Sequence, residues 1–262
     1  MTTRPAPWVP TTGHTTSRVS RRRRGPTIAA TALIAGLVAS CASCVSGAEV
    51  RDPGASAARE ATASVTATPP PGGIPRPDCI PASATFANVA SGPELVTPVA
   101  LLGTPGDRGV VLGSQSNGGI CQMVPFASEV AERGYRVAVI EWRGDRTDSM
   151  AAAVRATTAD GATRVVVGGF SEGAVIGLGG ATTFGPTVVG VVAVSGGPSR
   201  EDGYPSIASV SGFPGPILLV RARDDSVFPV DTEKRIAAAH AGTETVLVLD
   251  GDEHALALLR GE

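Results

Sequence analysis

A serine between glycines is the first residue in the sequence whose setting suggests chemistry. It lies in the segment Gly169-Phe170-Ser171-Glu172-Gly173, which follows an apolar β-branched run at residues 164–168 and precedes an apolar stretch of helical composition. On such a strand–turn–helix junction the serine sits on a tight turn that exposes its hydroxyl, and the helix N-terminus favours developing negative charge. Ser171 is therefore a candidate nucleophile, and the alternative is a glycine-rich turn with an inert serine.

A serine nucleophile needs a base, and the chain has only three histidines. His14 lies in a basic N-terminal region, and His240 ends a predicted helix, where it would cap the carboxyl end. His254 follows the predicted strand at residues 245–249, so it would stand just past the carboxyl end of that strand. We therefore expect His254 to be the base, against the alternative of a histidine on a surface loop.

A carboxylate that orients the histidine would complete the set. Asp224 and Asp225 follow the predicted strand at residues 217–222, and either would stand at its carboxyl end. Aspartate before serine is also common in plain turns, which is the alternative for both residues. The chain order of serine, aspartate and histidine is the order found in α/β-hydrolases.

Short apolar runs that alternate with helical patterns would position these side chains. Strands are predicted at residues 85–89, 99–102, 109–113, 136–141, 164–168, 188–195, 217–222 and 245–249. Helices are predicted at residues 125–133, 149–159, 172–182, 231–239 and 255–259. Several strands are continuously apolar, as expected where helices cover both faces of a parallel sheet. We therefore predict an open, mostly parallel, eight-stranded α/β sheet with flanking helices, and a site at the carboxyl ends of its strands.

Residues 79–262 resemble the α/β-hydrolases, and within them the dienelactone-hydrolase-like group of bacterial secreted lipoproteins. The matching segments are residues 110–122, 132–137, 169–173, 225–229 and 252–254. The resemblance implies that Asp225, rather than Asp224, is the acid. It also implies backbone N–H donors to an oxyanion at Ser116 and Glu172. Most members carry His-Gly where this chain has Ser114-Gln115, a departure that leaves backbone donors in place.

The residues between the sixth and seventh predicted strands, 196–216, are too few for the helical lid of many lipases. We therefore expect no large lid and an open site.

The N-terminus has the pattern of an export signal. Four consecutive arginines, residues 21–24, precede an uncharged apolar run at residues 27–39, which is too short to span a bilayer. The run ends Leu37-Val38-Ala39-Ser40-Cys41, which resembles a bacterial lipobox. We expect residues 1–40 to be a signal peptide and Cys41 to be lipidated. An ordinary signal peptide is the alternative, Cys44 is a weaker lipidation site, and the arginines also fit a twin-arginine signal.

Residues 41–77 are rich in Ala, Ser, Thr, Pro and Gly, which predicts a disordered tether before a domain at residues 78–262. The domain holds two of the four cysteines, Cys79 and Cys121, and an exported protein would join them in a disulfide. The family resemblance implies the same pair. Their spacing to histidine does not suit zinc, so we expect no metal and no cofactor.

The composition of the chain excludes some classes of binding partner. Apolar residues make up 42% and charged residues 18% of the chain, which excludes a disordered protein. Residues 41–262 hold 16 basic against 24 acidic residues, a formal charge of −8, and aromatics make up only 4%. This acidic balance and the scarcity of aromatic residues argue against nucleic acid as a partner. We expect a monomer that meets the membrane only through a lipid at Cys41, on the extracytoplasmic side of the cell membrane.

The sequence thus predicts a serine hydrolase that cleaves an ester of a small molecule through an acyl-enzyme on Ser171. One alternative is a non-catalytic lipoprotein that binds a ligand or partner on the same scaffold. Another is a nucleotide-binding fold, but Gly177-Leu178-Gly179-Gly180 lies inside a predicted helix and does not follow a strand.

Overall fold

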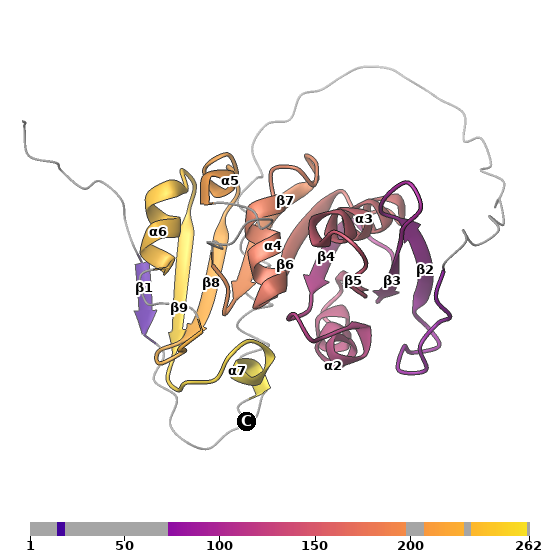
Figure 1. Cartoon of the computed structure of the whole chain (residues 1–262), viewed down its shortest axis with the longest axis horizontal. Coiled ribbons are helices and arrows are strands. Elements are labelled where there is room, and N and C mark those ends of the chain that lie inside the picture. The colour runs from indigo at the N-terminus through magenta and orange to yellow at the C-terminus, as the bar shows by residue number, and fades with distance from the viewer. Residues whose placement is uncertain (1–14, 19–72, 198–206, 228–231, 261–262) are drawn as a thin grey trace, which may run out of the picture.

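The structure is a computed structural model that describes residues 15–18, 73–197, 207–227 and 232–260 (Figure 1). Most of the predicted signal peptide, the lipidation site Cys41 and the tether up to residue 72 lie outside the described residues. Among the helices of the described part, none is both long and apolar enough to cross a bilayer.

The described strands form one sheet in the order β1-β9-β8-β7-β6-β4-β5-β3-β2. Their bounds are β1 (Thr15–Arg18), β2 (Thr85–Ala90), β3 (Val96–Leu102), β4 (Arg108–Gly113), β5 (Arg136–Ile140), β6 (Arg164–Phe170), β7 (Val188–Val194), β8 (Ile217–Ala222) and β9 (Glu244–Leu249). Only the pairs β2–β3 and β3–β5 are antiparallel. All eight predicted strands are present, so the mostly parallel sheet is confirmed. The ninth strand, β1, was not predicted: it comes from the segment interpreted as a signal peptide and pairs in parallel with β9.

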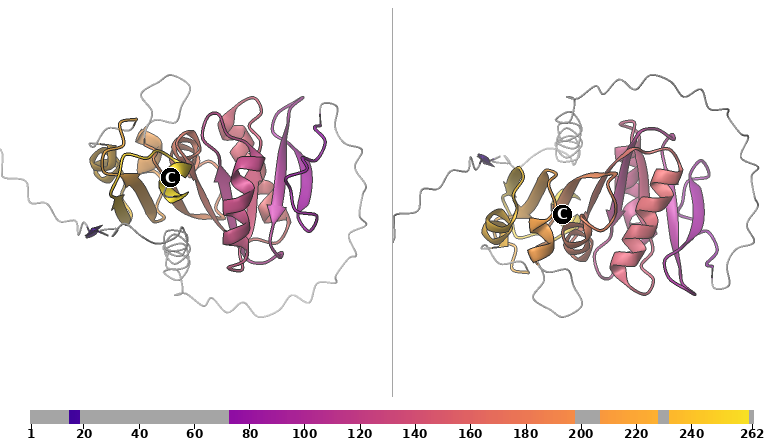
Figure 2. Two further views of the ribbon diagram at one scale, coloured as in Figure 1. Left: turned by 90° about the horizontal axis from the view of Figure 1, so that it is seen from below. Right: turned by 90° about the horizontal axis from the view of Figure 1, so that it is seen from above.

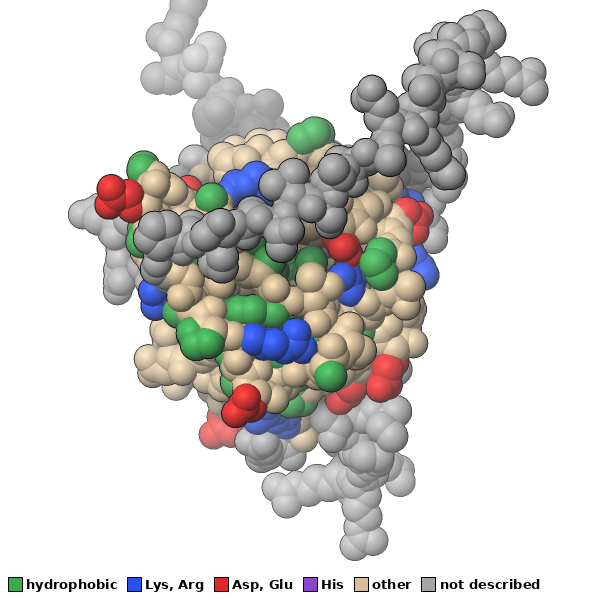
Figure 3. Space-filling view, turned by 90° about the vertical axis from the view of Figure 1, so that its right-hand side faces the viewer, with side chains coloured by type: hydrophobic (Ala, Val, Ile, Leu, Met, Phe, Trp, Pro, Cys, Tyr) green, Lys and Arg blue, Asp and Glu red, His purple; other side chains and the backbone are tan. Residues whose placement is uncertain are grey.

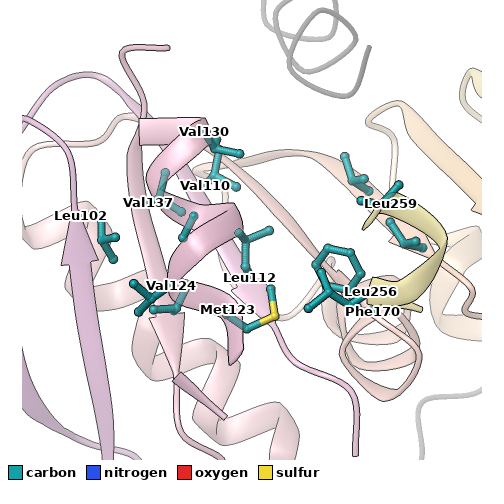
Figure 4. Close-up of a cluster of buried hydrophobic side chains, with 14 of the residues drawn as sticks. Leu102, Val110, Leu112, Met123, Val124, Val130, Val137, Phe170, Leu256 and Leu259 are labelled. Carbon is teal, nitrogen blue, oxygen red and sulfur yellow. The ribbon is translucent and has the colours of Figure 1, made fainter. Parts of the chain in front are cut away.

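Helices cover both faces of the sheet (Figures 1 and 2). They are α2 (Ile120–Ala131), α3 (Arg146–Ala159), α4 (Glu172–Gly180), α5 (Ile207–Ser211), α6 (Thr232–Ala239) and α7 (Leu256–Arg260). Residues of α2 and α7 belong to one buried apolar cluster, part of which is drawn in Figure 4. Residues of α3, α4, α5 and α6 belong to a second cluster on the opposite face. The result is a three-layer α/β/α domain.

The strand sequences explain the two clusters. Along β4, Val110 and Leu112 join the α2 cluster while Val111 joins the α3 cluster, because successive side chains of a strand point to opposite faces. Both faces are buried, so the strand needs apolar residues at every position and reads as a continuous apolar run.

The surface of the domain is mixed. On the side where β2 lies, basic, acidic and hydrophobic side chains are interspersed in small groups (Figure 3). In the described part of the chain, the exposed large apolar side chains are Leu95 and Val227.

The chain reverses direction across the sheet at β4. From β4 it passes through α2 to β5 on one side, and then through α3 to β6 on the other side. In open α/β sheets such a reversal opens a crevice at the carboxyl ends of the strands. The loop after β4 and the turn after β6 therefore meet at this edge.

Several predicted helix boundaries were wrong. Helix α2 begins at Ile120 rather than at residue 125, because a carboxylate from another strand caps it, and Pro125 lies inside the helix. Helix α3 begins at Arg146 rather than at residue 149, since Asp145 supplies an N-cap whose side chain accepts from the N–H of Asp148 at 3.0 Å.

Smaller differences concern the ends of other elements. Strand β3 begins at Val96 rather than at residue 99, α4 ends at Gly180 rather than at residue 182, and α7 begins at Leu256 rather than at residue 255. The short helix α5 was not predicted. It occupies described residues of the segment for which we expected no lid, and residues 198–206 of that segment lie outside the described part.

Candidate active site

Ser171 occupies a strained turn between β6 and α4. Its backbone has φ 51° and ψ −110°, a left-handed conformation that few residues other than glycine adopt. The Ser171 N–H donates to the carbonyl of Val194 on β7 at 2.9 Å, and the Ser171 carbonyl accepts from Ala174 at 3.0 Å and Val175 at 3.1 Å. These bonds hold the turn in place against its strain, which is of the order of 1–3 kcal/mol. The side chain is half-buried, so a substrate can reach it.

The flanking glycines allow the turn to approach its neighbours. A Cβ on Gly173 would lie 2.2 Å from the carbonyl oxygen of Gly113, at the end of β4. A Cβ on Gly169 would lie 2.4 Å from the carbonyl carbon of Gly173. The sequence G-x-S-x-G therefore has a packing reason here: β4, β6 and α4 meet backbone to backbone at this point.

Asp225 and His254 form a pair at the same edge of the sheet. Asp225 follows β8, its side chain is fully buried, and its Oδ2 lies 2.9 Å from Nδ1 of His254, which follows β9. The other oxygen, Oδ1, accepts from the N–H of Val227 at 2.9 Å. An ionised Asp225 requires the proton on Nδ1, which leaves Nε2 of the partly exposed imidazole as a base.

The two loops that carry this pair are joined to each other. The N–H of Arg223 donates to the carbonyl of Leu249 at 2.8 Å, and the N–H of Asp224 donates to the carbonyl of Gly251 at 3.0 Å. An exposed ion pair adds to these bonds, with Arg223 Nη2 2.7 Å from Asp250 Oδ1. The hydrogen bond and charge of Asp250 raise the pKa of Arg223 above its ordinary value.

Of the two candidate acids, the structure thus places Asp225 beside His254, while the backbone of Asp224 joins the two loops.

The predicted oxyanion loop follows β4. Its turn is closed by the N–H of Gly118, which donates to the carbonyl of Gln115 at 2.8 Å. The N–H of Gly173 donates to the carbonyl of Ser114 at 3.1 Å, so the loop is tied to the first turn of α4. Ser116 lies exposed at the tip of this loop, and Glu172 directly follows Ser171. Both predicted backbone donors therefore belong to segments that meet at the turn.

Comparison with known proteins agrees with this arrangement. A family model described as phospholipase/carboxylesterase matches residues 146–254. An esterase of Pyrococcus furiosus superposes with a TM-score of 0.54 at 14% identity, covering 65% of this chain and 82% of the other. A dienelactone hydrolase of Anabaena variabilis superposes with a TM-score of 0.53 at 16% identity, covering 68% and 90%. No curated protein gives a significant match.

The domain has the α/β-hydrolase fold. Its resemblance to the dienelactone-hydrolase-like group, predicted from the sequence motifs, is confirmed by these neighbours. The family match and the fold support a hydrolase.

An arginine lies next to the turn of this α/β-hydrolase domain. Nε of Arg146 is 3.4 Å from Oε1 of the buried Glu172, and the Arg146 guanidinium lies over the ring of Trp142, 5.2 Å from its centroid. If Ser171 acts as the predicted nucleophile, a carboxylate beside it would repel an oxyanion that forms there. Arg146 offsets that charge.

The predicted disulfide joins Cys79 to Cys121, with their Cα atoms 5.5 Å apart. Cys121 lies in the first turn of α2, directly after the oxyanion loop. Within the described ranges, no group of three or more His, Cys, Asp and Glu side chains is arranged to hold a metal ion.

Two titratable residues behave differently from the sequence-based expectation. His240 follows α6, but its buried ring stacks on Phe213 and its Nδ1 lies 3.5 Å from Oε1 of Glu244, so the side chain does not cap the helix as predicted.

Glu141 was interpreted only as the last residue of a predicted strand. Its Oε2 accepts from the N–H of Ile120 at 3.0 Å, beside the oxyanion loop. The sequence signal that could have indicated it is a helix that begins after two glycines, with no capping side chain of its own.

Proposed function

We propose that the domain is a serine hydrolase that cleaves esters of small molecules through a Ser171–His254–Asp225 triad. The observation that carries the proposal is the Asp225–His254 pair, 2.9 Å apart, at the sheet edge where Ser171 occupies a strained turn. A buried carboxylate that orients a partly exposed imidazole has its main use in proton transfer to and from a nearby nucleophile. The family match to phospholipases and carboxylesterases supports the same chemistry.

The reaction proceeds in two halves. His254 Nε2 takes the proton of the Ser171 hydroxyl as Oγ attacks the ester carbonyl, and Asp225 stabilises the imidazolium. The N–H groups of Ser116 and Glu172 donate to the oxyanion, and the alcohol leaves with the proton held by His254. Water, deprotonated by His254, then releases the acid from the acyl-enzyme and restores Ser171.

Covalent labelling tests the nucleophile directly. A fluorophosphonate probe should modify Ser171, identified by peptide mapping, and the purified domain should hydrolyse a short-chain nitrophenyl ester. Ser171→Ala should lose labelling and lower kcat by about 10⁴-fold or more, because triad members act together. Circular dichroism and the thermal midpoint would show that the variant is folded.

Ser195 offers a matched control. It also has a positive φ, 48°, and it follows the neighbouring strand β7, but its hydroxyl is fully buried. Ser195→Ala should keep the label and the turnover. If the wild-type domain binds esters without turnover and takes no label, it is a non-catalytic binding protein on this scaffold and the proposal is wrong.

We further propose that the chain is exported, cleaved before Cys41 and anchored by a lipid on that cysteine, with residues 41–77 as a tether and 78–262 as the domain. Cleavage would remove β1 and leave β9 as the edge strand of the sheet. The basic and apolar N-terminal pattern supports this proposal, and so does the disulfide, which is typical of oxidising compartments. Cells fed an alkyne fatty acid should label the wild type and Cys44→Ser but not Cys41→Ser. Equal labelling of the two variants would contradict the choice of Cys41.

A further inference from the structure

We propose that Glu141 is a positioning residue for the proposed ester hydrolysis, because its carboxylate holds the oxyanion loop from outside. The inference rests on the proposed function. Glu141 directly follows β5, and Oε2 accepts from the N–H of Ile120, the first residue of α2, at 3.0 Å. The oxyanion loop is the segment immediately before Ile120.

Helix α2 has no cap of its own. Its N-cap residue is Gly119, which offers no side chain, and its first turn holds no acidic residue. The first N–H groups of a helix need acceptors, and a negative charge near them is stabilising. Glu141, 21 positions further along the chain, supplies both the acceptor and the charge.

The Glu141 carboxylate also occupies the space directly beside Gly119. A Cβ on Gly119 would lie 2.4 Å from Oε2 and 2.8 Å from Oε1 of Glu141. Gly119 has φ −151° and ψ −169°, an extended conformation that any residue can adopt. The backbone conformation therefore does not require glycine here. Glycine is required because the Glu141 carboxylate occupies the space that a Cβ would fill.

These contacts matter because they fix the end of the loop that leads into α2, beside the Gly118–Gln115 bond within its turn and the disulfide at Cys121. The loop contains Gly118 and Gly119 and ends on Ile120, and its other end is tied to α4 by the bond from the Gly173 N–H to the Ser114 carbonyl. Between these two ties lies Ser116, the proposed backbone donor. Loss of the Glu141 contact would remove the side-chain tie at the α2 end of the donor segment, and misplacement by about 1 Å can cost about 10²-fold in rate.

Steady-state kinetics on a nitrophenyl ester tests the proposal. Glu141→Ala should lower kcat about thirtyfold with KM changed by less than about twofold, since an oxyanion donor acts in the transition state. A boronic acid that forms a tetrahedral adduct with Ser171 should bind more weakly by a similar factor. Glu141→Gln keeps an acceptor oxygen and should stay within about threefold of the wild-type kcat.

Asp145 provides the matched control. It caps α3 as Glu141 caps α2, but it lies exposed and its carboxylate accepts from the N–H of Asp148 on α3 itself. Asp145→Ala should lower the thermal midpoint by a comparable amount and change kcat by less than about threefold. If Glu141→Ala lowers kcat no more than Asp145→Ala does, Glu141 is only a structural cap and the proposal is overturned.

A double-mutant cycle with Gly119→Ala tests the contact itself, and Gly119→Ala alone, which leaves Glu141 in place, serves where Glu141→Ala folds poorly. The added methyl group should displace the carboxylate and lower kcat about tenfold in the wild-type background. In the Glu141→Ala background the same methyl group finds space and should change kcat by less than about twofold. Equal effects in both backgrounds would overturn the proposal. A wild type that is inactive, or is not labelled at Ser171, would instead contradict the proposed function.

Discussion

The two edges of the same sheet are built in opposite ways. At the edge where most strands begin, Arg136 is buried and its guanidinium contacts Asp160 at 2.5 Å, Thr85 Oγ1 at 3.2 Å and the carbonyl of Gly103. At this edge the positive φ angles belong to glycines: Gly103, Gly134, Gly161 and Gly185. Glycine adopts a positive φ without strain, so the backbone at this edge is relaxed.

The edge where the parallel strands end carries the strain. In the described part of the chain, three residues other than glycine have positive φ: Ser171, Ser195 and Ala255. They follow β6, β7 and His254. Strained backbone persists only where the surrounding structure holds it, and it concentrates at functional sites. The comparison indicates that one edge is built for stability and the other for the site.

The largest expected effect is on turnover. Asp225→Asn should lower kcat by about 10⁴-fold at neutral pH, because an amide favours the wrong imidazole tautomer. The amide still offers an oxygen to the Val227 N–H, so the thermal midpoint should change little. Ester turnover and melting curves measure the two effects. An active variant would show that the reactive edge does not depend on this pair.

The disulfide should affect stability first. A double variant, Cys79→Ser with Cys121→Ser, opens a loop with a sequence separation of 42 residues. Loop entropy alone predicts a loss of about 4 kcal/mol in the free energy of unfolding. Urea denaturation of this variant, beside wild type with and without reductant, gives the loss. A drop in kcat of the folded variant would show that the bond also supports the oxyanion loop.

Breaking the opposite edge should leave the chemistry intact. Arg136→Met removes a buried charge and leaves Asp160 without its partner, at a cost of about 3 kcal/mol in unfolding free energy. At a temperature where the variant is folded, kcat per labelled serine should equal that of wild type. A fall in kcat of the folded variant would show that the edge with Arg136 also affects the chemistry.

The smallest effect belongs to the exposed pair between the site loops. Asp250→Asn removes the charge that raises the pKa of Arg223, yet solvent screens an ion pair this exposed and its contribution to stability is small. The raised pKa keeps Arg223 charged, so the contribution of this ion pair to stability does not fall as the pH rises from neutral. We expect kcat within about twofold of wild type, because the backbone bonds still join the loops. A larger loss would assign the alignment of His254 to this ion pair.

Most of the sheet was predictable because burial on both faces requires continuous apolar runs, as in residues 164–168 and 217–222. Helix starts were less predictable. The sequence predicted a helix from residue 125, yet α2 begins at Ile120, whose cap comes from Glu141, directly after β5. A local rule cannot see an acceptor that arrives through folding. At α3 the cap is local: Asp145 directly precedes the helix, so the sequence itself contains the signal for that start.

The sequence by itself determined the strand–turn–helix setting of Ser171, which depends on neighbouring residues, and the chain order of the candidate triad, which needs no contact between its members. The residues alone left Asp224 and Asp225 open, the family resemblance implied Asp225, and the tertiary structure places that carboxylate beside His254. Asp224 and Asp225 are adjacent and alike in sequence, but their places in the turn differ, and one carboxylate is buried against the imidazole. The tertiary structure alone decided the position of Glu141, because a contact across 21 residues leaves no local pattern.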